Sequence, residues 1–234
     1  MSNYLVAQPP IEADHYGYKF GDTVVKDGKA VAIHPGDDLN FGSSGNAEIG
    51  APMKPMSDGE VIFAQNGGDG WGNVLVIWHP RLNRWTRNGH LNKFYVKVGQ
   101  QVKMSDIVGE VGKTGTGSAH DHFEIIKKKL PSWLTYPNLS QGWTLEKVKE
   151  YWENPREFIE RVNKEAAQIP AWAQPSVDKA IAKKIALQWD NPQEIVGNAG
   201  AEDIFFNLGA ITEKQGNLSK VRLIVAADRL NLLN

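Results

Sequence analysis

The chain has 234 residues, with 26 Lys and Arg against 27 Asp and Glu, and it contains no cysteine. This length allows one sizeable core with an appendage, or two small domains. The balanced charge and the lack of a basic run give no support for a nucleic-acid partner. The absence of cysteine excludes a disulfide-stapled fold and a cysteine-ligated structural zinc site.

The N-terminal ten residues have neither the basic start nor the long apolar stretch of a secretory signal. No run in the sequence approaches the roughly 18 apolar residues of a membrane-spanning helix. We therefore expect no membrane span.

Residues 1 to about 125 have the pattern of a β-rich domain. Short apolar runs alternate with Gly, Pro, Asn and Asp turns at 23–25, 59–64, 73–78, 95–98, 107–111 and 120–126. Such runs predict a fold that is mainly β with appended α: an antiparallel β-sheet with a cleft on one face, followed by a helical C-terminal part.

The first polar cluster in this region surrounds a turn. Pro35 and Gly36 exclude a regular helix and favour a turn that folds His34 and Asp38 back toward a common point. A histidine and a carboxylate are ligands suited to zinc. Asp37 is a rival to Asp38 as the carboxylate ligand.

The second cluster lies in the run 120–126. Residues two apart on a strand share a face, so His120 and His122 are expected to project side by side, followed by Glu124. Taken alone, the two histidines could equally lie on a solvated strand face. Together with His34 and Asp38, however, His122 would complete a set of three protein ligands, two nitrogens and one oxygen, around a metal ion. The fourth position would be left for water, which is the layout of a catalytic zinc site.

Three separated motifs in this order resemble the lysostaphin-type (LytM-like) zinc endopeptidases of peptidoglycan. The motifs are His34-x-x-x-Asp38, Gly89-His90-Leu91 and His120-x-His122-Phe123-Glu124. The strand-like segments between these motifs also resemble the family: Asp58-Gly59-Glu60-Val61, Gly70-Trp71-Gly72-Asn73 and Ile107-Val108-Gly109-Glu110. The resemblance covers residues 30 to 126 well and extends more loosely to about 160.

The resemblance implies a role for each of five residues. His34, Asp38 and His122 resemble the ligands of one zinc ion, and His90 and His120 resemble two catalytic histidines. Zinc lowers the pKa of a bound water to about 7, and neighbouring imidazoles can move its protons. The implied reaction is hydrolysis of peptide bonds in bacterial peptidoglycan cross-links or stem peptides.

Two residues depart from the family pattern. Asp121 stands where a leucine is usual between the two strand histidines, and Asn88 stands where a tyrosine is common. Neither departure removes a ligand, but both keep a second hypothesis open, in which the chain is a non-catalytic peptidoglycan-binding or activator module on the same scaffold.

Glu124 is either a partner that orients a ligand histidine or a solvated residue. His79 is expected to be structural, and His15 to lie at the surface.

A third hypothesis compares 98–112 with the hairpin of biotin- or lipoate-carrying domains. That stretch lacks the Met-Lys-Met or Asp-Lys-Ala turn that such domains need, which argues against it.

A peptidoglycan substrate lies outside the cytoplasm, whereas no signal peptide is recognised. We expect action on the cell wall, reached by phage-type release from the host cytoplasm as in an endolysin, with a lost signal or an export device as alternatives.

The C-terminal part is expected to be helical. Residues 130–137 are expected to form an aromatic loop that either contacts substrate or covers the sheet as an apolar plug. Thr144 is placed to cap a helix over 145–152. A second helix is expected from 156 to about 168. We therefore assign 1–168 to the endopeptidase domain, with its core at 30–126 and closing helices at 144–168. A proline-containing linker at 169–175 leads to a small helical unit at 176–234, which serves either cell-wall targeting or a structural or dimerising role.

Overall fold

The computed structural model describes residues 7–42 and 45–167, with side chains up to Lys164 in the last helix. Within these ranges, 7–79 and 84–160 form one compact unit, and 80–83 and 161–167 fall in a second. The expected linker and the helical unit at 176–234 lie outside the described residues.

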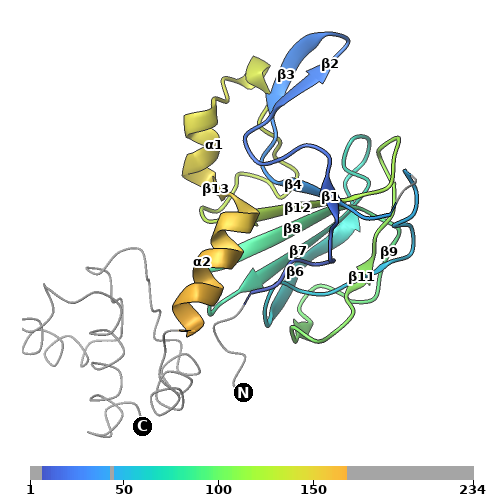
Figure 1. The fold of residues 1–234 in the computed structure, drawn as a ribbon, viewed down its shortest axis with the longest axis vertical. Helices are drawn as coiled ribbons and strands as arrows, with labels where there is room; N and C mark the ends of the chain where they lie inside the picture. Colours follow the sequence, from blue (N-terminus) through green and yellow to red (C-terminus); the bar gives the residue numbers. More distant parts are fainter. Residues whose placement is uncertain (1–6, 43–44, 168–234) are drawn as a thin grey trace, which may run out of the picture. The chain divides into compact units, whose positions relative to one another are not determined.

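The predicted mainly β fold is confirmed, and its centre is an antiparallel sheet of eight strands among the described residues (Figure 1). The strand order is β1-β4-β12-β8-β7-β6-β10, and β13 pairs with the end of β12. The strands are β1 (His15–Tyr16), β4 (Asp37–Asn40), β6 (Gly59–Asn66), β7 (Asn73–His79), β8 (Arg84–Leu91), β10 (Gln101–Val102), β12 (Asp121–Ile126) and β13 (Trp152–Glu153).

Two smaller sheets and three helical segments complete the described part of the chain. A three-stranded sheet joins β5 (Pro52–Met53), β11 (Gly109–Glu110) and β9 (Lys93–Phe94), and a two-stranded ribbon joins β2 (Thr23–Lys26) and β3 (Lys29–Ile33). The helical segments are η1 (Leu139–Gln141), α1 (Leu145–Tyr151) and α2 (Pro155–Ala167). None of the described helices is long and apolar enough to cross a membrane.

The strand predictions are confirmed where apolar residues dominate. The runs at 23–25, 59–64, 73–78 and 120–126 correspond to β2, β6, β7 and β12. The run at 107–111 contains only the two-residue β11. The predicted strand at 95–98 is wrong, because β9 ends at Phe94 and the following Tyr95 and Val98 are 48% and 60% exposed.

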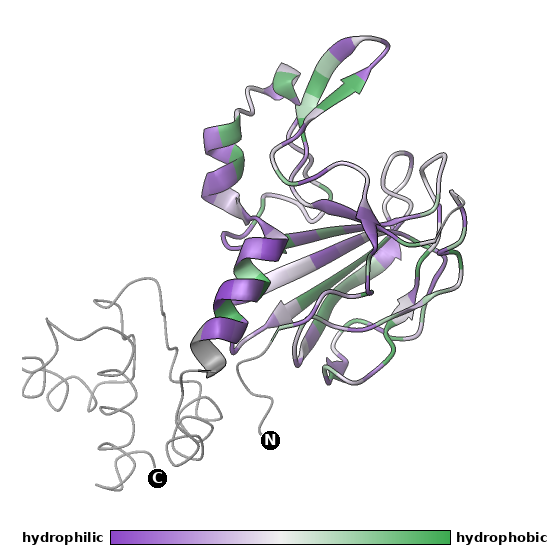
Figure 2. Ribbon diagram, viewed as in Figure 1, coloured by the Kyte–Doolittle hydropathy of each residue, from purple (hydrophilic) through white to green (hydrophobic). Residues whose placement is uncertain are grey.

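The helix predictions are confirmed to within one residue at the ends that the structure describes. The Thr144 hydroxyl accepts a hydrogen bond from the Lys147 amide at 3.3 Å and caps α1. Pro155 is the first residue of α2, where its missing N–H costs nothing, and the Asn154 side chain accepts from the Arg156 amide at 3.2 Å. Figure 2 shows α2 as mostly hydrophilic with hydrophobic turns at intervals.

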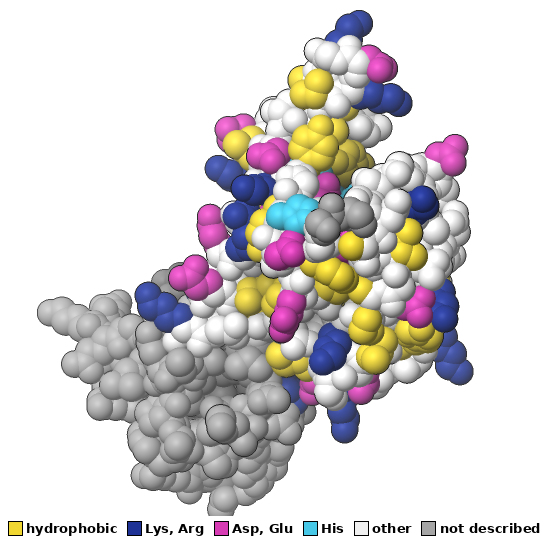
Figure 3. Space-filling view, turned by 45° about the vertical axis from the view of Figure 1, so that its right-hand side comes forward, with side chains coloured by type: hydrophobic (Ala, Val, Ile, Leu, Met, Phe, Trp, Pro, Cys, Tyr) yellow, Lys and Arg dark blue, Asp and Glu magenta, His cyan; other side chains and the backbone are white. Residues whose placement is uncertain are grey.

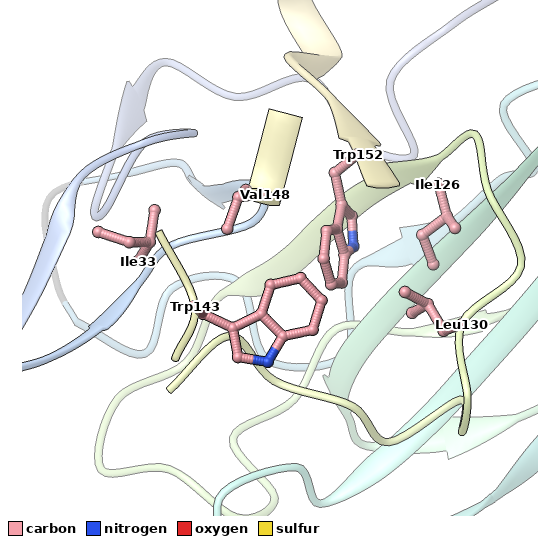
Figure 4. Packing of buried hydrophobic residues seen from close by; sticks show 6 residues of the cluster. All are labelled: Ile33, Ile126, Leu130, Trp143, Val148 and Trp152. Atoms are coloured by element: carbon pink, nitrogen blue, oxygen red, sulfur yellow. The ribbon is translucent and has the colours of Figure 1, made fainter. Parts of the chain in front are cut away.

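One hydrophobic cluster holds the elements after β12 against the sheet (Figure 4). Its buried members are Ile33, Ile126, Leu130, Trp143, Val148 and Trp152. The Trp143 and Trp152 rings meet edge to face, with centroids 5.3 Å apart. A second buried cluster consists of Trp71, Val74 and Val76. Leu134 and Tyr136 of the aromatic loop at 130–137 pack against it. The surface in Figure 3 carries basic and acidic side chains interspersed, as the balanced charge predicts.

His79 ends β7 in a fully buried position. Its Nε2 lies 2.9 Å from the Thr86 hydroxyl, and its Nδ1 lies 3.3 Å from the Asp58 carbonyl oxygen. Burial disfavours the charged imidazole and lowers the pKa of His79 to about 4, although nearby backbone carbonyls oppose the shift.

The low pKa of His79 predicts a pH-dependent loss of stability. The folded pKa lies below the unfolded value of about 6.5, so the contribution is complete above that pH and is lost as the pH falls toward 4. We expect this residue to account for a loss on the order of 3 kcal/mol over that range. Urea unfolding of the wild type, His79→Gln and the exposed control His15→Gln, from about pH 7 to about pH 4.5, measures the slope. A shallower slope is expected for His79→Gln alone; identical slopes for all three proteins would contradict the assignment.

Candidate metal centre

Three side chains from distant parts of the sequence converge on one point. His34 Nε2 lies 3.1 Å from Asp38 Oδ1, Asp38 Oδ1 lies 2.8 Å from His122 Nδ1, and the two histidine nitrogens lie 3.0 Å apart. All three residues are buried. They form the one group of potential metal ligands found among the described residues.

The backbone explains this convergence. Asp38 in β4 lies directly opposite His122 in β12 in the antiparallel register. His34 Nδ1 lies 2.7 Å from the Gly36 carbonyl oxygen, which turns Nε2 toward the other two ligands. A Cβ at Gly36 would lie 2.1 Å from the Phe123 carbonyl oxygen, so only glycine permits this close approach of the turn to β12.

The three ligand atoms fit a zinc ion. Tetrahedral zinc with bonds of about 2.0–2.1 Å separates its ligands by roughly 3.3 Å, close to the observed 2.8–3.1 Å. Two nitrogens and one carboxylate oxygen are ligands that zinc accepts. Burial opposes ionisation of Asp38, but hydrogen bonds from His122 and His34 outweigh it and hold the Asp38 pKa well below its usual range. The carboxylate is therefore charged and ready for a cation.

His90 and His120 lie beside this group. Their ring centroids are 4.6 Å apart, the rings of His90 and His122 are 5.9 Å apart, and His120 Nε2 lies 3.6 Å from Asp38 Oδ1. The four histidines and the one aspartate to which the family resemblance assigns roles thus lie together at one site.

The protonation of the two flanking histidines follows from their surroundings. Nδ1 of His90 lies 3.0 Å from the Thr114 carbonyl oxygen, and Nδ1 of His120 lies 3.2 Å from that of Ser118. Each Nδ1–H can donate there, which leaves Nε2 as an acceptor. Burial, with repulsion from His122 and His120, lowers the pKa of His90 to about 3, and burial also lowers the pKa of His120. Both imidazoles are therefore neutral near pH 7.

An irregularity in β8 directs His90 toward the candidate metal ligands. The pairing of β7 with β8 passes from Leu75↔Asn88 to Asn73↔Leu91, so three steps on β8 oppose two on β7. His90 occupies this bulge with a φ of 64°. In a regular strand, His90 would share a face with Asn88; the bulge moves it to the opposite face. In the sequence, only the family motif marks His90, and no pattern predicts the bulge.

Asn88 and Asp121, the two residues that depart from the family pattern, are hydrogen-bonded to each other. On the sheet face opposite the metal ligands, the Asn88 amide donates to both carboxylate oxygens of Asp121, at 3.1 and 3.0 Å. Both side chains are buried. Burial raises the pKa of Asp121 to about 7, even though the hydrogen bond from Asn88 opposes the shift.

The remaining candidates are also placed by the structure. Asp37 points away from the ligands and pairs with Arg156 at 2.9 Å, so it is not part of the group. The solvated alternative for Glu124 is wrong, because its side chain is fully buried and Oε1 lies 2.7 Å from His122 Nε2. His15 is exposed beside Asp14.

The family model of peptidase family M23 matches residues 38–132, a range that includes Asp38 and the three histidines at 90, 120 and 122. This region is a peptidase family M23 domain. His34 lies just before the matched range and is the remaining member of the candidate ligand group.

Named proteins share this M23 region. Peptidoglycan DD-endopeptidase ShyB of Vibrio cholerae is 41% identical over 36% of this chain and 19% of its own length. Murein hydrolase activator NlpD of Salmonella typhimurium is 34% identical over 38% of this chain and 26% of its own length. The solved catalytic domain of lysostaphin from Staphylococcus simulans is 26% identical, with a TM-score of 0.43, covering 56% of this chain and 92% of that one. This chain spans less than a third of the length of the curated relatives it matches.

The ligand geometry predicts one zinc ion per chain. Replacing His34, Asp38 or His122 by Ala should weaken zinc binding by more than about 100-fold, since changes to mere supporting partners of ligands already cost 10- to 100-fold. Metal analysis after zinc loading and gel filtration measures the stoichiometry. His15→Ala serves as the control and should retain the ion; retention of wild-type affinity by any of the three ligand variants would contradict the site.

The Asn88–Asp121 pair predicts an energetic coupling. Asp121→Leu leaves the buried Asn88 amide unpaired and should cost roughly 1–3 kcal/mol of stability. The double variant Asn88→Leu/Asp121→Leu should recover most of that loss, because neither polar group remains. Chemical unfolding of the two single variants and the double variant gives the coupling energy. Strictly additive effects would show that the two side chains do not interact.

Proposed function

We propose that this M23 domain is a zinc-dependent endopeptidase that hydrolyses peptide bonds in bacterial peptidoglycan cross-links or stem peptides. The observation that carries the proposal is the joint position of three metal ligands and two neutral histidines, His90 and His120, beside them. The names of relatives such as the DD-endopeptidase ShyB and the glycyl-glycine endopeptidase ALE-1 support the substrate class.

Zinc held by His34, Asp38 and His122 would supply Lewis acidity that polarises the scissile carbonyl and makes water a better nucleophile near neutral pH. The protein supplies the proton transfers. Because Nε2 of both flanking histidines is an acceptor, one imidazole can take a proton from the attacking water. The imidazole that took this proton then carries it on Nε2 and can donate it to the leaving amine.

The alternative is an activator of other wall hydrolases. It is favoured by the similarity to murein hydrolase activator NlpD, which matches at 34% identity. The intact set of five site residues argues for the enzyme, because a module that acts only by binding does not need two neutral histidines beside a metal site.

Action at the cell wall, outside the cytoplasmic membrane, is part of the proposal. Bacteriolytic action of the endolysin type is also part of the proposal. A turbidity assay tests it, because lysis of added bacteria lowers the turbidity of the suspension. A digest of walls with defined cross-bridges, followed by mass spectrometry of the new amine ends, identifies the bond that is cut.

The proposed roles predict a separation of activity from metal binding. His90→Ala and His120→Ala should each reduce the release of new amines from purified peptidoglycan by roughly 100- to 10,000-fold. Both variants should keep one zinc ion, because neither residue belongs to the ligand group. His34→Ala should lose both properties, and a chelator should inactivate the wild type.

Controls distinguish the enzyme from the activator. His15→Ala should match the wild type in amine release. An activator would release no amines by itself, would stimulate an added peptidoglycan amidase, and would be indifferent to His120→Ala; this combination would overturn the proposal.

A further inference from the structure

The two ring nitrogens of His122 have different partners. Nδ1 faces the metal ligand group, 2.8 Å from Asp38 and 3.0 Å from His34. Nε2 points the other way and lies 2.7 Å from Glu124 Oε1. Because Glu124 follows His122 by two residues on β12, both side chains lie on the same face of the sheet. With a metal ion in the site, Nδ1 would give up its hydrogen bond to Asp38, while the Glu124 carboxylate would continue to accept the Nε2 proton.

Glu124 is itself fixed by two buried donors. The Arg87 guanidinium donates to Oε1 at 2.7 Å and contacts Oε2 at 2.6 Å, and the Trp152 indole N–H donates to Oε2 at 2.6 Å. The three side chains are at most 1% exposed. A buried carboxylate with an ion-pair partner and two further hydrogen bonds has few alternative positions.

Arg87 connects this carboxylate to the aromatic loop beside the metal site. Its guanidinium donates to the carbonyl oxygens of Trp133 at 2.7 Å and Thr135 at 3.0 Å. It also lies over the Trp71 ring, 4.1 Å from the centroid. A shift of Glu124 would therefore disturb contacts on three segments of the chain, so the network acts as a rigid support.

We propose that Glu124, held by Arg87 and Trp152, is a positioning residue that fixes the ring orientation and tautomer of His122, so that Nδ1 is presented to the metal ion. The inference rests on the proposed zinc site and concerns metal binding rather than the chemical step. A carboxylate behind a ligand histidine raises the basicity of that ligand and removes its rotational freedom.

The test measures zinc affinity by competition with a chromophoric chelator. Glu124→Gln keeps the side-chain shape but removes the charge, and Glu124→Asp keeps the charge for Arg87 but withdraws the carboxylate by one methylene from His122. Both variants should bind zinc 10- to 100-fold more weakly than the wild type. In the cobalt-loaded protein, both should also shift the visible absorption bands, because the ligand field from His122 changes.

Asp37→Asn is the matched control. Asp37 is another fully buried carboxylate, ion-paired with Arg156, that touches no ligand of the group. This variant should lose stability yet keep zinc affinity within about threefold and leave the cobalt spectrum unchanged.

Each outcome decides the inference. Wild-type affinity in a folded Glu124→Gln or Glu124→Asp protein overturns it, as does an equal loss of affinity in Asp37→Asn, which would show a general effect of stability. If Glu124→Gln fails to fold, Glu124→Asp decides alone, because it keeps a negative charge to compensate Arg87. A wild type that binds no zinc refutes the proposed function as well, whereas a zinc-binding wild type with insensitive variants refutes this inference alone.

Discussion

The antiparallel register of β12 with β4 and β8 is the constraint on which the site depends. It sets His122 opposite Asp38 on one side and opposite Gly89 on the other. A shift of one residue would turn every side chain of β12 to the other face and separate the ligands. The sheet therefore does more than carry the site: its hydrogen-bond pairing determines which residues meet.

Ion pairs supplement the apolar contacts of this sheet, and the Arg87–Glu124 pair is fully buried. Arg87 pairs with Glu124, Arg84 with Glu153, and Asp37 with Arg156. Removing one partner of a buried ion pair leaves an uncompensated charge and costs far more than the pair contributes. Of these pairs, Arg87–Glu124 also contacts a candidate metal ligand, His122, so that fold stability and site geometry depend on it together.

The five candidate site residues chosen from the sequence lie together in the structure, whereas some of the strands that carry them were not predicted. Apolar strands such as β7 and the capped helix α1 were recognisable because their patterns follow burial. β8 was missed because its sequence, with Arg84, Arg87 and Asn88, has the composition of a loop; only the paired partners from distant segments make it a buried strand. The bulge at His90 left no signal in composition, and the partnership of Asn88 with Asp121 required the register between two strands.

The left-handed backbone of His90 has a consequence for the evolution of this domain. A φ of 64° carries a backbone cost for histidine that glycine would not have, so the domain retains local strain at this position. Selection for thermal robustness alone would favour relaxation of that strain, whereas selection for turnover would preserve it. Under the proposed function, a lineage that no longer cuts its substrate loses the reason to keep histidine at position 90 and should replace it with glycine.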